Sequence, residues 1–186
     1  EKMHLKFHQL IAKNEIGISQ RKLDLKVESK KTHAETLKEL LSLNPNEEMK
    51  IEIDYEVART HFLLTRNPAT KDHTSFNEED LIKLLDRLED TEEKKPEDSL
   101  NTADVSDHLQ QAIQILEPYL ASKKTPPYIR NLLAICYRNL DLKKNPESQD
   151  RAIEILRDLV EQFPATPEYR LELANTLTKN AAFNQQ

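Results

Sequence analysis

Residues 112–116 read Ala-Ile-Gln-Ile-Leu, and residues 152–156 repeat the pattern as Ala-Ile-Glu-Ile-Leu after an interval of 40 positions. A proline, an arginine and a Leu-Ala pair recur downstream at the same interval: Pro127, Arg130 and Leu133-Ala134 match Pro167, Arg170 and Leu173-Ala174. Self-similarity at such a period is typical of stacked helical repeats. Each repeat buries its apolar side against its neighbours, so the array offers an extended binding surface rather than one catalytic cleft.

The composition favours an all-α protein. The 186 residues include one glycine and no tryptophan, and 32% of them are charged. β-Sandwiches and Rossmann-type folds need glycine at turns or phosphate loops, so the composition argues against both. No apolar run approaches the roughly 18 to 20 residues that span a bilayer, and no signal-peptide pattern opens the chain. Because the chain starts without methionine and ends within an expected helix, we expect it to be a piece of a larger protein.

Apolar spacing predicts four helices in the C-terminal half. The clearest covers residues 149–163, with apolar side chains at i, i+3, i+4 and i+7. The others cover residues 109–120, where Pro118 should loosen the last turn, residues 129–140, and a stretch that begins at Tyr169. Together they predict two helical hairpins.

The N-terminal third is predicted to form three further helices. One runs from about Glu47 to Thr65, and a long charged helix runs from about Gln20 to Leu43. Gly17 is expected to separate the charged helix from a first helix over residues 1–14, because glycine often ends helices. The alternative is one continuous helix through Gly17, at a cost of about 1 kcal/mol.

The repeated helices carry a residue pattern that identifies a family. Leu and a small residue, followed by an aromatic or large apolar residue, stand in the first helix of each unit: Leu133-Ala134 with Tyr137, and Leu173-Ala174 with Leu177. Second-helix positions are held by Ala152, Leu156, Leu159 and Pro164. This pattern resembles the tetratricopeptide repeat (TPR) family and implies a right-handed α-solenoid of TPR-like hairpins. The chain departs from the family in lacking tryptophan and a turn glycine, and in its longer period.

The extra length lies between the first and second helix of a unit, most of all between Ala58 and Ala112. We therefore expect N-terminal helices over residues 1–45, the second of which can pack as a partial repeat. A TPR-like array over residues 46–180 follows, with an insertion over residues 67–108 inside its first repeat. Such insertions emerge on one edge of a solenoid, where they often serve binding.

The expected insertion is acidic and carries an apolar stripe. From Glu78 to Asp107 there are 12 acidic and 4 basic residues. Four leucines share one face of a short predicted helix: Leu81, Leu84, Leu85 and Leu88. The stripe either docks on a partner or covers the groove. The alternative is a helix packed on the solenoid with a solvated loop behind it.

The resemblance also implies a ligand groove, lined by first-helix side chains that point away from the core. Alignment on the repeated alanines places these side chains there: Tyr55, Arg59, Phe62, Asn131, Ile135, Arg138, Asn139, Asn175 and Lys179. The cations could hold carboxylates or phosphate, and the asparagines could bond an extended peptide backbone. Ile135 stands where the carboxylate clamp of chaperone-binding members has asparagine, so that clamp is not expected. Ordinary polar surface is the alternative interpretation.

Residues typical of catalysis or metal binding are few. His4 and His8 share a helix face, a spacing compatible with a metal pair, but no third ligand has suitable spacing. Cys136 lies in an apolar pattern and is expected to be buried, and His61 is expected to be a packing residue. No phosphate loop or cysteine cluster is present in the sequence. We therefore expect no catalysis, cofactor or metal in this chain.

The sequence favours a non-catalytic interaction or sensory scaffold that binds a protein or peptide. Residues 163–174 also resemble repeat regions attached to bacterial serine/threonine protein kinases, which implies a larger signalling protein. The alternatives are a helical metal-dependent or catalytic domain and a module that self-associates through exposed repeat ends. The net charge of −6 and the lack of a basic stripe with stacking aromatics disfavour nucleic acid as a partner.

Overall fold

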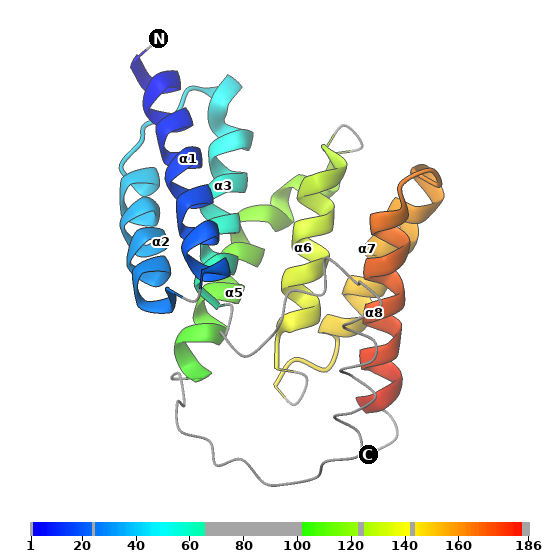
Figure 1. Ribbon diagram of the computed structural model, residues 1–186. Coiled ribbons are helices and arrows are strands. Elements are labelled where there is room, and N and C mark those ends of the chain that lie inside the picture. The colour runs from blue at the N-terminus through cyan, green and yellow to red at the C-terminus, as the bar shows by residue number, and fades with distance from the viewer. Residues whose placement is uncertain (1, 24, 66–101, 123–124, 142–143, 184–186) are drawn as a thin grey trace, which may run out of the picture.

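The computed structural model describes residues 2–23, 25–65, 102–122, 125–141 and 144–183, and these residues form an all-α protein (Figure 1). Seven α-helices and one 3-10 helix follow one another in the described chain: α1 Lys2–Lys22, α2 Lys26–Leu41, α3 Glu47–Thr65, α5 Thr102–Leu116, η1 Glu117–Ala121, α6 Pro127–Asn139, α7 Ser148–Gln162 and α8 Pro167–Phe183. Helices that are consecutive in this order pack side by side in antiparallel pairs.

The contacts between helices follow a regular order. Three pairs pack most extensively, namely α1 with α2, α3 with α5, and α6 with α7. We call α1, α3, α6 and α8 the first helices, and α2, α5 and α7 the second helices. Each first helix also contacts the next one, whereas in the described parts of the chain no contact joins α2 to α5 or α5 to α7.

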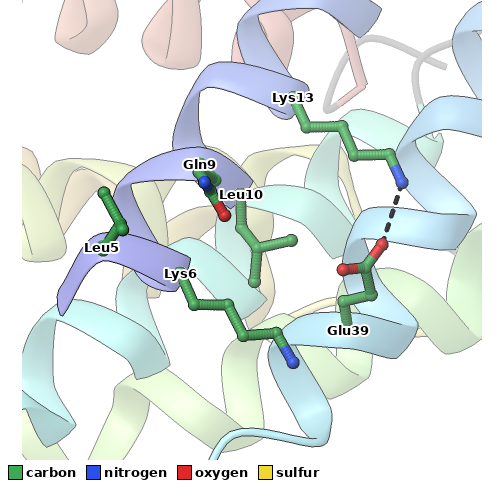
Figure 2. Close-up of a pocket in the computed structure, with 6 residues that line it drawn as sticks. All are labelled: Leu5, Lys6, Gln9, Leu10, Lys13 and Glu39. Atoms are coloured by element: carbon green, nitrogen blue, oxygen red, sulfur yellow. Dashed lines mark hydrogen bonds and ion pairs between the residues drawn. The ribbon is translucent and has the colours of Figure 1, made fainter. Parts of the chain in front are cut away.

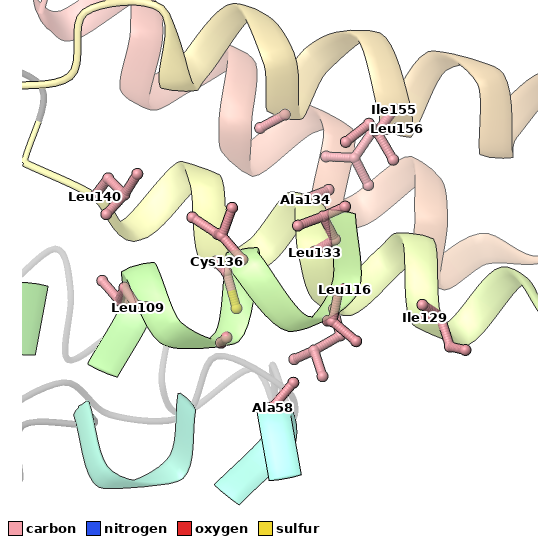
Figure 3. Packing of buried hydrophobic residues seen from close by; sticks show 14 of the residues in the cluster. Ala58, Leu109, Leu116, Ile129, Leu133, Ala134, Cys136, Leu140, Ile155 and Leu156 are labelled. Carbon is pink, nitrogen blue, oxygen red and sulfur yellow. The ribbon is translucent and has the colours of Figure 1, made fainter. Parts of the chain in front are cut away.

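Two apolar cores meet at α3. On one side Met49, Ile53 and Val57 are buried in a cluster with residues of α1 and α2. On the other side Ala58 belongs to the larger cluster that α5, α6 and α7 complete (Figure 3). Besides Ala58, its fully buried side chains are Ala112, Leu116, Ile129, Leu133, Ala134, Cys136, Ala152, Leu156 and Leu159. Apolar residues on two faces of α3 thus join the N-terminal hairpin to the rest.

The prediction that Gly17 separates two helices was wrong, because α1 continues through it to Lys22. Glycine is needed here for a close approach. A Cβ at this position would lie 2.6 Å from Cε1 of His33 on α2, well inside contact distance. The Ser29 hydroxyl also donates to the Gly17 carbonyl at 2.7 Å. The charged helix α2 accordingly begins at Lys26 rather than near Gln20.

The predicted C-terminal helices are confirmed. Pro118 lies in the short 3-10 helix η1 that closes α5, as its effect on the last turn predicts. Pro127 occupies the first turn of α6, where a missing N–H costs nothing. Helix α5 begins earlier than its apolar stripe suggested, at Thr102. The predicted insertion stripe Leu81, Leu84, Leu85 and Leu88 lies outside the described residues.

The contact between Gly17 and His33 gives a testable prediction. In the wild-type chain we expect Gly17→Ala to lower the free energy of unfolding by about 1–3 kcal/mol, because the methyl group collides with the imidazole. In a His33→Ala background the same change should stabilise by up to about 1 kcal/mol, since alanine favours the helix. Urea denaturation of the four proteins measures this. An unchanged effect of Gly17→Ala in the two backgrounds would show that His33 is not the obstacle.

Candidate binding surface

Tyr55 on α3 lies against Tyr128 at the start of α6. The ring centroids are 4.7 Å apart and the planes are inclined by 73°, an edge-to-face arrangement that is favourable for aromatic pairs. Tyr55 is half-buried, and burial raises the pKa of its phenol. Tyr128 remains 42% exposed, so one aromatic surface is open to solvent. This pair is a contact between adjacent first helices.

Arg59, one turn along α3, is held by two carboxylates. Its Nη2 donates to Glu15 of α1 at 2.5 Å, and its Nη1 lies 3.3 Å from both carboxylate oxygens of Glu56. The Arg59 side chain is 22% exposed and the Glu56 side chain is 8% exposed. An anionic ligand would therefore have to compete with carboxylates that are already in place.

Arg138 and Lys179 meet at the other end of the surface. The guanidinium of Arg138 forms an ion pair with Glu172 of α8. The backbone carbonyl of Arg138, in the last turn of α6, accepts hydrogen bonds from Lys179 Nζ at 2.6 Å and from Gln149 Nε2 at 2.9 Å. Cations near the last carbonyls of a helix are stabilising, so Lys179 caps α6.

The remaining predicted residues differ in how they are held. Asn139 donates to the carbonyl of Ile135 within its own helix at 2.7 Å, and Ile135 is half-buried. Phe62 is half-buried against the larger core. Asn175 is exposed on α8. Oδ1 of Asn131 is buried and has no hydrogen-bond partner among the described residues.

The structure brings the predicted surface together in two groups. One group joins Tyr55 and Arg59 to their neighbours on α1 and α6, and the other joins Arg138 to Lys179 on α8. Sequence reasoning missed Tyr128 as well as the carboxylates Glu15 and Glu172. Tyr128 could have been found, because it precedes Asn131 by three residues and Ile135 by seven, on one face of a helix. The carboxylates are distant in sequence and leave no local pattern.

A buried polar cluster lies beside this surface, between α1, α2 and α3. Asn14 donates from Nδ2 to Thr60 Oγ1 at 2.7 Å, and Glu56 Oε2 lies 3.4 Å from the same nitrogen. The amide oxygen Oδ1 of Asn14 lies 3.1 Å from His33 Nδ1. The amide oxygen must accept, so His33 carries its proton on Nδ1 and presents an unprotonated Nε2 towards Gly17. Burial, with Arg21 and Arg59 nearby, lowers the pKa of His33 to about 4.

A second histidine is buried between α3 and α5. His61 Nδ1 lies 2.9 Å from Nδ1 of His108, a hydrogen bond that needs one protonated and one unprotonated nitrogen. Burial, followed by the charge of His108, lowers the pKa of His61 to about 4. The prediction that His61 is a packing residue is confirmed by its 8% exposure.

Other groups considered as chemical sites lie elsewhere. Cys136 is fully buried, as predicted, and burial raises the pKa of its thiol to about 12. His4 and His8 are exposed on α1. Within the described ranges no three metal-ligating side chains gather at one place. None of the described helices has the length and apolar character needed to cross a bilayer.

Comparison of the chain with protein-family models, with curated proteins and with solved structures found no match.

The buried histidines predict a pH-dependent stability. Their pKa values of about 4 lie below the ordinary value of 6.5, so between these limits the unfolded chain binds protons that the native chain does not. The contribution of the neutral histidines to the stability of the folded protein is complete above pH 6.5 and is lost as the pH falls towards 4. Each histidine should contribute a slope of about 1.4 kcal/mol per pH unit to the free energy of unfolding. Urea denaturation across this window measures the slope.

A matched pair of variants isolates one histidine. His61→Phe should remove its share of the slope, whereas His4→Gln, at an exposed position, should leave the slope unchanged. Equal slopes in all three proteins would contradict the assignment of His61 as neutral and buried.

Proposed function

We propose that this chain is an α-solenoid of TPR-like hairpins that acts as a non-catalytic scaffold for a protein or peptide partner. The order of helix contacts supports the proposal. First helices contact each other in turn while second helices do not, as in an array that curves towards its first helices. The sequence repeat at an interval of 40 residues, which relates α5–α6 to α7–α8, also supports an array of similar helical hairpins.

The proposed binding site rests mainly on three side chains that share one face of α6, which we call the α6 stripe. Tyr128, Asn131 and Ile135 follow one another at helical spacing on a first helix. Tyr128 offers an exposed ring that packs edge-to-face against Tyr55. Oδ1 of Asn131 is buried without a partner among the described residues, and such a group costs about 1–3 kcal/mol when it stays unsatisfied. The Asn131 side chain is half-buried, so a peptide N–H would bond to its amide oxygen after the side chain rotates towards the solvent.

The ion pairs of Arg59 and Arg138 indicate which chemical class of ligand fits this surface. Arg59 is paired with Glu15 and Glu56, and Arg138 is paired with Glu172. Phosphate or carboxylate groups would have to displace these partners, whereas main-chain amides and apolar side chains would not. We therefore favour an extended peptide held by main-chain hydrogen bonds and by contact with Tyr128. The sequence resemblance suggests that this scaffold lies beside a kinase domain in a larger bacterial protein.

Peptide selection on the full chain tests the site. A random peptide library is panned against the protein, and binding of a selected peptide is measured by calorimetry. Tyr128→Ala and Asn131→Ala should each weaken binding by about tenfold, because a typical central contact contributes more than 1 kcal/mol.

The matched control is Leu41→Ala, an exposed apolar position on α2 away from the stripe, which should not change the affinity. Affinity that survives both stripe variants but disappears on deletion of residues 77–101, which leaves α5 intact, would move the site to the insertion.

A further inference from the structure

The N-terminal end of the molecule exposes an apolar stripe along α1. Leu5 and Ile16 are 64% and 55% exposed, and Ala12 is exposed between them. Leu23, which is 73% exposed, directly follows α1 and still donates its N–H to the Ser19 carbonyl at 3.1 Å, as the next helical residue would. Intervals of seven, four and seven residues return these side chains to one face of a helix. The stripe is about 27 Å long at 1.5 Å per residue. None of the described helices covers these side chains.

The surroundings of this stripe are basic. Helix α1 contains five basic residues and one acidic residue. A shallow hollow next to the stripe is lined by Leu5, Lys6, Gln9 and Lys13, with Glu39 of α2 on its far side (Figure 2). Lys13 is paired with Glu39, whereas Lys6 and Lys22 have no ion pair among the described residues. Lys6 is close enough to Glu39 for its charge to help lower the pKa of that carboxyl.

The C-terminal end has the complementary character. Helix α8 exposes Leu171 and Leu177, which are 46% and 40% exposed, with the exposed Ala174 and Ala181 on the same arc. Between α7 and α8 lies a hollow bordered by Leu177 and by four carboxylates, those of Asp150, Glu154, Asp158 and Glu161, with one arginine. Asp150, Arg157 and Glu161 have no ion pair in the part of the chain that the structure describes, so the unpaired charge around this hollow is net negative.

We propose that the α1 stripe of one copy docks on the α7–α8 face of a second copy, so that the chain associates head to tail. Each face is apolar at its centre and charged at its rim, and the two rims are opposite in sign. Pairing of like faces would set lysines against lysines or carboxylates against carboxylates, which disfavours symmetric dimers. The lengths also agree, because α8 spans about 25 Å.

A contact between two different faces leaves one of each face free at the ends of every open assembly. Such heterologous association continues by addition of further copies, as an open filament or until a ring closes, instead of stopping at a symmetric dimer. The head-to-tail contact does not involve Tyr128 or Asn131. An experiment that contradicts one of the two proposals therefore leaves the other unaffected.

Sedimentation equilibrium of the full chain tests the proposal. The average mass should rise with concentration beyond that of a dimer, and added salt should lower it. Ile16→Glu disables the α1 face and Leu177→Lys disables the α7–α8 face, so each variant alone should stay monomeric. An equimolar mixture of the two should form a one-to-one dimer that does not grow. Val27→Glu, at a 77% exposed position on α2, is the matched control and should assemble like the wild type.

Three outcomes would overturn the proposal. The first is a wild-type chain that stays monomeric at all concentrations. The second is a mass that levels off at the dimer and responds to only one of the two face variants, which indicates a symmetric contact. The third is assembly that occurs only after deletion of residues 77–101, because the insertion would then be the occupant of the stripe. Circular dichroism of each variant verifies that the helices are retained.

Discussion

The packing of α3 on both of its sides is the constraint on which the rest of the structure depends. Met49, Ile53 and Val57 are buried against the N-terminal hairpin, while Ala58 is buried in the core of α5, α6 and α7. A helix with apolar residues on two faces is stable only when neighbours cover both. Removal of either neighbour would expose apolar surface on α3, so the described helices form a continuous packed series.

Hydrogen bonds and ion pairs add specificity where apolar packing alone would be permissive. Asn14 of α1 is fully buried and bonds to Thr60 of α3, and it faces His33 of α2. A shift of any one helix by a turn would leave this amide without partners in a low-dielectric interior. The cluster therefore fixes how the first three helices align. Ion pairs such as Arg59 with Glu15 and Arg138 with Glu172 fix neighbouring first helices in the same way.

Local periodicity was sufficient to predict α6 and α7, since their apolar residues recur at regular helical spacing over the whole element, and it also predicted where α8 begins. It failed at Gly17, because the reason for glycine lies on another helix, in the ring of His33. The polar partners of Arg59 and Arg138 were missed for the same reason. Periodicity identifies which face of a helix is buried, but it contains no information about which distant side chain meets that face.

The side and the ends of the molecule have different chemistry, and this difference bears on the two proposals together. On the side formed by the first helices, arginines are neutralised by neighbouring carboxylates. At the ends, Lys6, Lys22, Asp150 and Glu161 have no ion pair among the described residues. Association through the ends would leave the stripe on α6 uncovered in every copy. Each added copy would then present one more peptide site, and a partner with several copies of the peptide would bind more tightly through multivalency without any new contact.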